Sequence, residues 1–497
     1  MKGFFASIII LITAATALTT ANPSWLNLAN SENNKYRYKL DVPASTPYAM
    51  ARYVEQLKQN EFDIAGYSWQ DKQIEIITDD EGLKKLETLN LKGKILETYN
   101  SHSISGVMDD FVRVDPQYLT PDKVTAKLKD LNARYPNLTR LEQIGTSNQG
   151  VPIWALLISN TPDAKSAEYY DKPSIIFDGM HHARELMTSE VVMDVADVLL
   201  SSEVRNDKKW QPLLDKWNVW IVPMLNVDGR NIVTTQDKWW RKNARTENGK
   251  TFGVDINRNY SFNWNKCNGS SGNRNNDTYR GASGNSEPET QALVSLAEKV
   301  IPTASLSYHS FSELIIYPYG CKGVFTGENV LLSRIANELA PLLPSDKGTG
   351  TYTTGTPWQL LYSVDGDSSS YMFGKFGAVS YTFEINLEFQ PLYSLKQPTL
   401  VKHRKAWSYF LNRLSNNLLT LKIIDGKTRA AAEADIRIAN IVLDQGETPY
   451  RTNISGNYFK VLDPGKYTFG VTLKDGRTTQ FEIEMNGTPQ QKVITVE

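Results

Sequence analysis

The amino-acid sequence predicts an α/β protein: a mixed, largely parallel sheet with helices on both faces, preceded by a small α+β unit and followed by a small β-sandwich. Three observations support this prediction. A chain of 497 residues is too long for one ordinary domain, so two or three are expected. Continuous apolar runs alternate with helical stretches through the middle of the chain, which is typical of strands buried on both faces. After Asn417 the pattern changes to short alternating strands separated by turn signals.

Residues 1–21 are typical of a secretory signal peptide. One positive charge is followed by a short apolar run and then by small residues, with cleavage expected near Ala17 or Ala21. We therefore expect a secreted or periplasmic protein. Export would permit a disulfide between the only two cysteines, Cys267 and Cys321, but two unpaired thiols are also compatible with the sequence.

Residues 22–110 are expected to form a small α+β unit and the linker that follows it. The expected succession is β-α-β-α-β, with strands at Tyr36–Val42, Gln73–Thr78 and Leu91–Glu97 and helices at Tyr48–Lys58 and Asp80–Leu89. Residues 101–110 are expected to be an exposed linker.

Residues 111–417 are expected to form the central α/β domain. Thr120 is suited to cap a helix that has Pro121 in its first turn. The expected strands are Thr139–Gly145, Ile153–Ser159, Ser174–Asp178, Trp217–Pro223, Ala304–His309 and Ala378–Ile385. Further helices are expected from Ser189, through Ile335 and from about Pro398 to Leu414.

Residues 418–497 are expected to form the β-sandwich. Turn signals recur at Asp425-Gly426, Gly456-Asn457, Asp463-Pro-Gly465 and Asp475-Gly476, and helical periodicity is absent. The stretch holds no cluster of catalytic side chains, so we expect the chemistry to lie in the central domain.

The charge and hydropathy of the chain exclude two classes of partner. A formal net charge of −1 supplies no basic field for nucleic acid. Beyond the N-terminus no stretch is long and apolar enough to span a membrane.

Two expected strands end in side chains that can bind a metal ion. The run Ser174–Asp178 is followed by His181, His182, Arg184 and Glu185, at the strand end where open α/β sheets place their ligands. His182 and Glu185 are three residues apart and can hold one ion together. His309 ends another expected strand and can supply a third ligand, leaving one position open for water. A lone histidine at a strand end is more often a structural residue, so this interpretation depends on further motifs.

Six ordered motifs supply that support: Gly179–Glu185, Trp240–Asn243, Gly253–Asn259, Tyr279–Gly281, Tyr308–Ser310 and Tyr381–Glu384. Together they resemble the zinc metallocarboxypeptidase family, in its pancreatic carboxypeptidase A/B-like and bacterial carboxypeptidase T-like subfamily, over about Tyr118 to Asn417. The resemblance implies a carboxypeptidase-like fold for residues 111–417. It also implies one Zn²⁺ per chain, held by His182, Glu185 and His309.

The flanking units carry weaker resemblances. Residues 22–110 stand where secreted carboxypeptidases have a propeptide, although an N-terminal domain retained in the mature protein remains an alternative. Residues 418–497 resemble the transthyretin-like modules appended to some carboxypeptidases.

The resemblance also assigns roles within the site. It makes Glu384 the general base, with Glu388 rejected for that role, and Arg241 the cation at the developing oxyanion. Residues matched to substrate binding are Asn257 and Arg258, which grip the C-terminal carboxylate, Arg184, which adds to its steering, Ser310, and Tyr362 as a mobile lid. His181 is expected to be structural rather than a ligand.

The loop before the base is expected to form the floor of the specificity pocket. Counting back from Glu384 places the small, neutral Ser369 there, with Asp367 two residues earlier. The segment 367–371 and Phe311 depart from the residues common in the family, which leaves the pocket less well defined. We expect aromatic and aliphatic C-terminal residues to be preferred and basic ones accepted more weakly.

The function expected from the sequence is therefore hydrolysis of the C-terminal peptide bond of peptides and proteins by a secreted zymogen, which an activating protease would cleave. A murein-peptide carboxypeptidase and an inactive peptide-binding protein are the alternatives.

Overall fold

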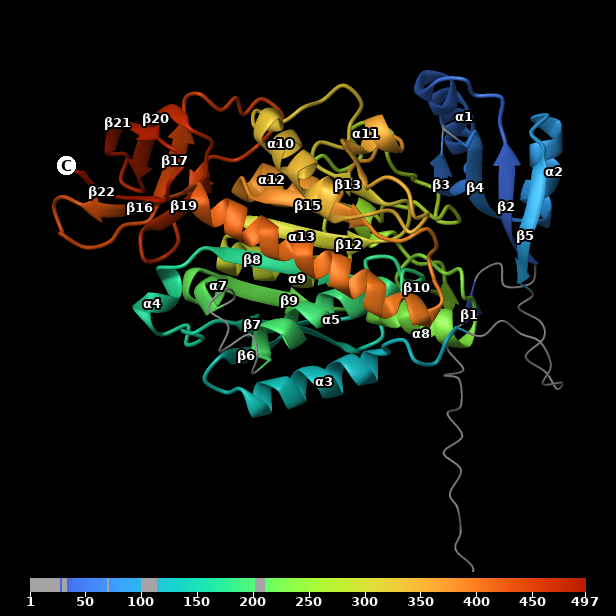
Figure 1. Ribbon diagram of the computed structural model, residues 1–497, viewed down its shortest axis with the longest axis horizontal. Helices are drawn as coiled ribbons and strands as arrows, with labels where there is room; N and C mark the ends of the chain where they lie inside the picture. The colour runs from blue at the N-terminus through green and yellow to red at the C-terminus, as the bar shows by residue number, and fades with distance from the viewer. Residues whose placement is uncertain (1–26, 29–33, 69–70, 100–113, 202–210) are drawn as a thin grey trace, which may run out of the picture.

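The computed structural model describes residues 27–28, 34–68, 71–99, 114–201 and 211–497. The predicted signal peptide and the predicted linker at residues 101–110 lie outside the described residues. We name residues 34–99 the N-terminal unit, residues 114–417 the central unit and residues 418–497 the C-terminal unit. The N-terminal and C-terminal units lie at opposite ends of the central unit (Figure 1).

The central unit is built on an eight-stranded sheet with the order β14-β13-β15-β12-β8-β9-β7-β6. Its strands are β6 (Thr139–Thr146), β7 (Pro152–Ile158), β8 (Ser174–Gly179), β9 (Asn218–Val222), β12 (Ala304–His309), β13 (Leu314–Ile316), β14 (Thr353–Gly355) and β15 (Val379–Glu384). The middle strands β9, β8, β12 and β15 pair in parallel, whereas β7 joins β9 and β13 joins β15 antiparallel. The predicted mixed sheet is confirmed. Strands β13 and β14 were not predicted, because three residues carry too little periodicity to be recognised.

Helices cover both faces of this sheet. The long helices α5 (Met187–Leu200) and α13 (Lys396–Asn416) pack against each other in front of the sheet in Figure 1, and α9 (Pro288–Val300) lies behind it. The other helices of the central unit are α3 (Pro121–Arg134), α4 (Ala167–Tyr170), α7 (Gln211–Lys216), α8 (Val227–Thr235), α10 (Asn329–Leu339), α11 (Pro357–Leu360) and α12 (Ser368–Phe376). Thr120 caps α3 as predicted, since its side chain accepts a hydrogen bond from Lys123 N at 3.3 Å. In the described residues, no helix is long and apolar enough to cross a membrane.

The N-terminal unit is a four-stranded antiparallel sheet, in the order β3-β4-β2-β5, with two helices. Its elements are β2 (Lys35–Asp41), α1 (Pro47–Gln59), β3 (Asp63–Ser68), β4 (Gln73–Asp79), α2 (Asp80–Thr88) and β5 (Gly93–Tyr99). The predicted β-α-β-α-β succession was wrong in omitting β3. That strand is short, holds Gly66 and shifts register between Ile64 and Gly66, so it lacks the clean alternation that identifies a strand.

The C-terminal unit consists of two small sheets around one apolar core, in agreement with the predicted sandwich. One sheet has the order β19-β16-β22 and the other β18-β17-β20-β21. The strands are β16 (Leu418–Asp425), β17 (Ala434–Ile438), β18 (Tyr450–Arg451), β19 (Asn457–Val461), β20 (Gly465–Leu473), β21 (Thr478–Met485) and β22 (Gln490–Val496). Alternate residues of β16 and β17, such as Leu421 and Ile436, are fully buried between the sheets.

The two cysteines form a disulfide. Cys267 and Cys321 have Cα atoms 5.8 Å apart and are bonded through their sulfur atoms. The alternative of two free thiols is therefore not adopted, and the bridge joins two loops of the central unit that are 54 residues apart in sequence.

Candidate metal centre

The ends of two parallel strands bring the three predicted metal ligands together. Strands β8 and β12 are neighbours in the sheet, and His309 is the last residue of β12. After β8 the chain turns sharply at Met180, whose φ is 57°, and the turn that leads into α5 carries His182 and Glu185. This arrangement at the carboxyl ends of adjacent strands is the one the sequence predicts.

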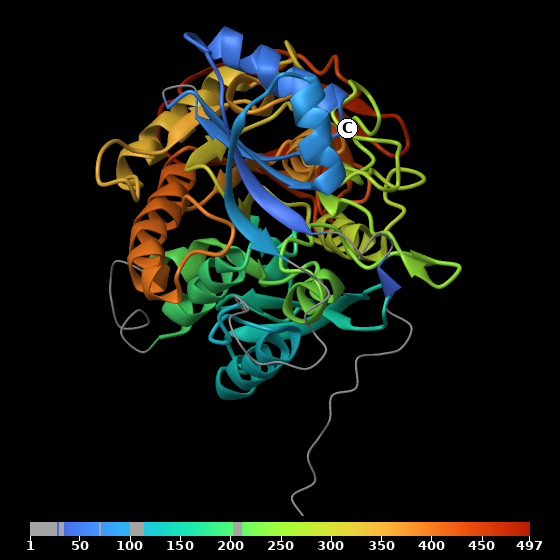
Figure 2. The same cartoon turned by 90° about the vertical axis from the view of Figure 1, so that its right-hand side faces the viewer.

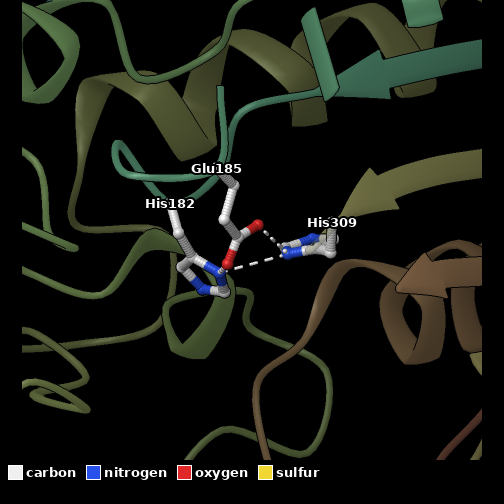
Figure 3. A group of neighbouring side chains, drawn as sticks. All are labelled: His182, Glu185 and His309. Carbon is white, nitrogen blue, oxygen red and sulfur yellow. Dashed lines mark hydrogen bonds and ion pairs between the residues drawn. The ribbon is translucent and has the colours of Figure 1, made fainter. Parts of the chain in front are cut away.

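The donor atoms of these three side chains converge on one point (Figure 3). His182 Nδ1 lies 2.7 Å from Glu185 Oε1 and 3.1 Å from His309 Nδ1, and His309 Nδ1 lies 3.0 Å from Glu185 Oε2. All three side chains are buried, and their ligand atoms fall within 4.8 Å of one another. In the described residues this is the one such group of histidine, cysteine and acidic side chains.

The chemistry of this donor set fits zinc. Two imidazoles and one carboxylate are a ligand set of catalytic zinc sites, and ligand atoms about 2.0–2.1 Å from a tetrahedral ion lie roughly 3.3 Å apart, close to the spacing seen here. Burial, and to a smaller extent the positive charge of Arg241, lowers the pKa of His182 to about 4. Burial, and to a smaller extent the charge of the neighbouring His181, lowers the pKa of His309 well below its ordinary value. Both rings are therefore neutral at physiological pH, as metal binding requires.

Asp255 contacts both the predicted metal ligand His182 and Arg241. Its Oδ1 lies 3.2 Å from His182 Nε2, and its Oδ2 accepts hydrogen bonds from Arg241 Nε and Nη2 at 3.1 and 2.9 Å. Burial alone would raise the pKa of Asp255, but Arg241, Arg258 and His182 hold it well below its ordinary value. The sequence reasoning gave Asp255 no role, although it lies inside the motif Gly253–Asn259.

A cleft beside the metal centre brings together most of the predicted site residues. Besides His182 and Glu185, it is lined by Arg241, Asn257, Arg258, Ser310, Tyr362, Asp367, Ser369 and Glu384. Glu384 ends β15 in register with His309 on β12. Burial, and to a smaller extent the negative charge of Glu185, raises the pKa of Glu384 well above its ordinary value. Glu388, rejected as the base, is half exposed and pairs with Arg37.

Strand β3 of the N-terminal unit covers this cleft. Ile64, Ala65 and Gly66 line the same space as His182 and Glu185. The adjoining Asp63 forms a two-pronged ion pair with Arg184, with oxygen–nitrogen distances of 2.5 and 2.9 Å, and both side chains are buried. Arg184 is thus engaged by the N-terminal unit and is not among the residues that line the cleft. The sequence reasoning missed Asp63 because the strand that carries it was not recognised.

The predicted lid tyrosine also contacts the N-terminal unit. Tyr362 packs against the apolar core of that unit, and Lys58 Nζ of α1 lies 4.8 Å from the centre of its ring. Lys58 also donates to Ser363 O at 2.9 Å. Helix α1 therefore covers the segment that carries Tyr362.

Asp367 and Ser369 lie in the cleft at the start of α12. Asp367 is the N-cap of this helix: its Oδ2 accepts hydrogen bonds from Ser370 N at 2.9 Å and from Ser369 Oγ at 2.8 Å. Its Oδ1 is buried and has no hydrogen-bond partner within the described residues. One oxygen therefore supports the helix, and the other remains available.

The ring of His181 stacks on that of His309, with the ring centres 5.1 Å apart, but its two nitrogens are bound to other groups. Its Nε2 lies 2.8 Å from the hydroxyl of Tyr260, and its Nδ1 lies 3.2 Å from Asp178 Oδ1. These contacts agree with the structural role expected from the sequence.

Comparison with known proteins agrees with a zinc site of this kind. The family model for zinc carboxypeptidase matches residues 124–405. Zinc carboxypeptidase A 1 of Anopheles gambiae is 29% identical over 271 residues, which cover 54% of this chain and 60% of that protein. Carboxypeptidase B of Astacus astacus is 29% identical over 274 residues, which cover 54% of this chain and 84% of that protein. The chain thus spans about 60% of the length of the first of these relatives.

Two solved structures share the fold. Carboxypeptidase A from Helicoverpa armigera superposes with a TM-score of 0.62 at 22% identity, over 76% of this chain and 96% of that one. Thrombin activatable fibrinolysis inhibitor superposes with a TM-score of 0.60 at 21% identity, over 76% of this chain and 98% of that one. The family match extends over more than half of the 497 residues and includes all three converging ligands, so this chain belongs to the zinc carboxypeptidase family.

Proposed function

We propose that this protein is a zinc-dependent carboxypeptidase that removes single residues from the free C-termini of peptides and proteins. One observation carries the proposal: two of the metal ligands, His182 and Glu185, share a single cleft with the carboxylate of Glu384 and with two arginines, Arg241 and Arg258. Peptide hydrolysis at a chain end needs a base, a cation for the oxyanion and a cation for the terminal carboxylate. The cleft provides a candidate for each.

Two residues that line the cleft, Arg258 and Asn257, are suited to hold the substrate's carboxylate. Arg258 presents a planar guanidinium, which binds carboxylates through paired hydrogen bonds. Its Nη1 donates to Asn257 O at 2.8 Å, which restricts the orientation of the group. The Oδ1 of Asn257 accepts a hydrogen bond from Ser368 N. The Nδ2 of the same amide lies 3.4 Å from His309 Nε2. A peptide with an amidated C-terminus would lose this binding.

Arg241 and Glu384 are suited to the chemical step. Zinc, when bound at His182, Glu185 and His309, supplies a Lewis acid and lowers the pKa of a water molecule. Glu384 takes a proton from the attacking water and delivers it to the leaving amine. Arg241, held in place by Asp255, stabilises the negative charge that develops on the carbonyl oxygen.

We further propose that the protein is exported as a zymogen. In this division residues 1–21 are the signal peptide, 22–110 the propeptide, 111–417 the catalytic domain and 418–497 an appended transthyretin-like domain. Support for inhibition comes from β3, which lines the cleft, and from the buried Asp63–Arg184 pair. The disulfide is consistent with an extracytoplasmic location. Cleavage between the two units by an activating protease would free the cleft.

The pocket floor suggests a broad preference among C-terminal residues. Ser369 is small and leaves room for an aromatic or aliphatic side chain, and the unpartnered Oδ1 of Asp367 offers one acceptor to a lysine or arginine. Hydrophobic residues would therefore be preferred and basic residues accepted more weakly.

The test is hydrolysis of N-blocked dipeptides by the zinc-loaded protein, before and after removal of the N-terminal unit. We expect release of the C-terminal amino acid and no release from the matching C-terminal amides. Hydrolysis of murein peptides alone would replace this proposal with the cell-wall alternative. Peptide binding without any hydrolysis would show that the cleft is a binding site only.

A further inference from the structure

Helix α12 is held at its C-terminal end by the C-terminal unit. Three carbonyl oxygens at this end accept hydrogen bonds from that unit: Gly374 O from Thr448 N at 3.2 Å, Lys375 O from Thr448 Oγ1 at 2.9 Å, and Gly377 O from Lys460 Nζ at 3.0 Å. The last carbonyls of a helix have no partner within the helix and must find one elsewhere. Here the partners come from a part of the chain more than 70 residues later.

The part of this contact made by Lys460 and Tyr450 is buried. Lys460 is 2% exposed and also pairs with Glu328, which precedes α10. A lysine at a helix C-terminus is favoured by the helix dipole. The ring of Tyr450 packs so closely on Gly377 that an added Cβ would lie 2.3 Å from it, and Gly377 itself has a φ of 66°. This junction leaves no room for a side chain at the end of α12.

The other end of the same helix forms the floor of the substrate cleft. Asp367 caps α12, Ser369 lies in its first turn, and both line the cleft. The backbone N–H of Ser368 donates to Asn257 Oδ1 at 2.9 Å, which joins the helix to the carboxylate-binding residues. The helix has nine residues, so a length of about 13 Å separates the cleft from the C-terminal unit. A rigid element this short passes a shift at one end directly to the other.

We propose that the C-terminal unit sets the specificity pocket by holding the C-terminal end of α12, with Thr448 and Lys460 as positioning residues. The proposal rests on the proposed carboxypeptidase function. It predicts that loosening this contact weakens binding of substrates whose C-terminal side chain fills the pocket. Substrates whose side chain does not reach the floor should be unaffected, because no hydrogen bond joins the metal ligands to α12 in the described residues. Asn257, which does contact the helix, is also held by the bond from its backbone N–H to Asp255 Oδ1 at 3.0 Å.

The test compares full-length chains, all activated by the same protease treatment, on two blocked dipeptides that end in Phe and in Ala. Thr448→Ala should raise KM for the Phe peptide about threefold to tenfold, the size that loss of one hydrogen bond permits. Its kcat on the Phe peptide, and both constants on the Ala peptide, should match the wild type. Thr448→Ser, which keeps the hydroxyl, should restore KM.

Lys422→Ala is the matched control, because Lys422 joins the C-terminal unit to Asp171 of the central unit and, in the part of the chain that the structure describes, forms no ion pair with α12. It should leave both peptides unchanged. A second variant, Lys460→Met with Glu328→Gln, removes the buried pair without leaving one charge alone, and should give the same selective rise in KM.

An equal loss on both peptides with Thr448→Ala, or no change on either, would overturn the proposal. If the wild-type protein hydrolyses neither peptide, the carboxypeptidase function itself fails, and that result is distinct from a failure of the α12 contact.

Discussion

At the scale of single residues, two carboxylates of one cleft, Glu185 and Glu384, have different surroundings. Both oxygens of Glu185 lie against the imidazoles of His182 and His309, and Ser310 N donates to one of them. Glu384 lines the same cleft, but its pKa is raised by burial and by the charge of Glu185. A carboxylate whose proton affinity is raised is suited to accept a proton during catalysis.

The first prediction concerns Glu384. Glu384→Gln should lower kcat by about 10²–10⁴-fold, because the amide cannot accept a proton from the attacking water. The zinc content, measured by metal analysis, and the KM for a blocked dipeptide should remain close to those of the wild type. Turnover within a few-fold of the wild type would place the base elsewhere.

The second prediction separates the two adjacent histidines. His182→Ala or His309→Ala should abolish stoichiometric zinc binding, because each removes one of three ligands. His181→Ala should keep the metal, since the ring nitrogens of His181 lie against Tyr260 and Asp178 and its contact with His309 is stacking of the rings. Metal analysis of the dialysed proteins distinguishes them. Full zinc occupancy in the His182 variant would contradict the ligand assignment.

The third prediction concerns the pocket floor. Asp367→Asn keeps an N-cap for α12 but removes the charge from its unpartnered oxygen. We expect kcat/KM to fall about tenfold for peptides ending in Arg or Lys and to change little for Phe or Leu, a difference of the size found for one charged hydrogen bond. An equal fall for both classes would show that Asp367 only supports the helix.

At the scale of elements, the buried carboxylates of Glu287 and Glu289, at the start of α9, are hydrogen-bonded to Asn243. Asn243 Nδ2 donates to both Glu287 Oε2 and Glu289 Oε2 at 2.9 Å, and its Oδ1 accepts from Val254 N at 2.7 Å. Val254 precedes Asp255, which holds Arg241. The start of α9 is thereby joined to the loop that carries Arg241.

The fourth prediction is a pH dependence of stability that originates in Glu289. Burial raises its pKa from 4.5 to about 7, so the folded protein binds the proton more tightly than the unfolded chain. This contribution to the free energy of unfolding is complete below pH 4.5 and is lost as the pH rises through about 7. Glu289→Gln should therefore reduce the fall in Tm between these two pH values. Parallel Tm curves for the wild type and the variant would contradict this origin.

At the scale of the whole molecule, ion pairs join the N-terminal unit to the central unit. Among them are Lys35–Asp237, Asp63–Arg184 and Asp71–Lys347. Of these three pairs, Asp63–Arg184 is the one in which both side chains are buried, whereas Asp71 and Lys347 are about half exposed. An exposed pair contributes little, while breaking a buried pair leaves an uncompensated charge.

The fifth prediction uses this difference. In the uncleaved chain, Asp63→Asn should raise the basal peptidase activity about tenfold or more, because it weakens the docking of β3 in the cleft. Asp71→Asn, the exposed counterpart, should leave the basal activity unchanged. After cleavage all three proteins should have the same kcat/KM. If the uncleaved wild type is already as active as the cleaved protein, the N-terminal unit is not an inhibitor.

The sequence by itself determined the parts of this protein that depend on neighbours along the chain. The apolar runs that become β8, β12 and β15 can be read directly, as can the His182–Glu185 spacing on one turn. His309 and Glu384 could be predicted because both directly end such runs, and parallel strands bring their carboxyl ends to one edge.

The tertiary structure alone decided the contacts between segments that are distant in sequence. Asp63 meets Arg184 across 121 residues, Cys267 is bonded to Cys321, and Thr448 binds the end of a helix whose start forms the pocket. The orientation of Asp367, with one oxygen on its own helix and one free, was likewise unreadable from the sequence. The reason is physical: periodicity and capping act over a few residues, whereas the partner of a charged or polar side chain is chosen by packing after the units have folded together.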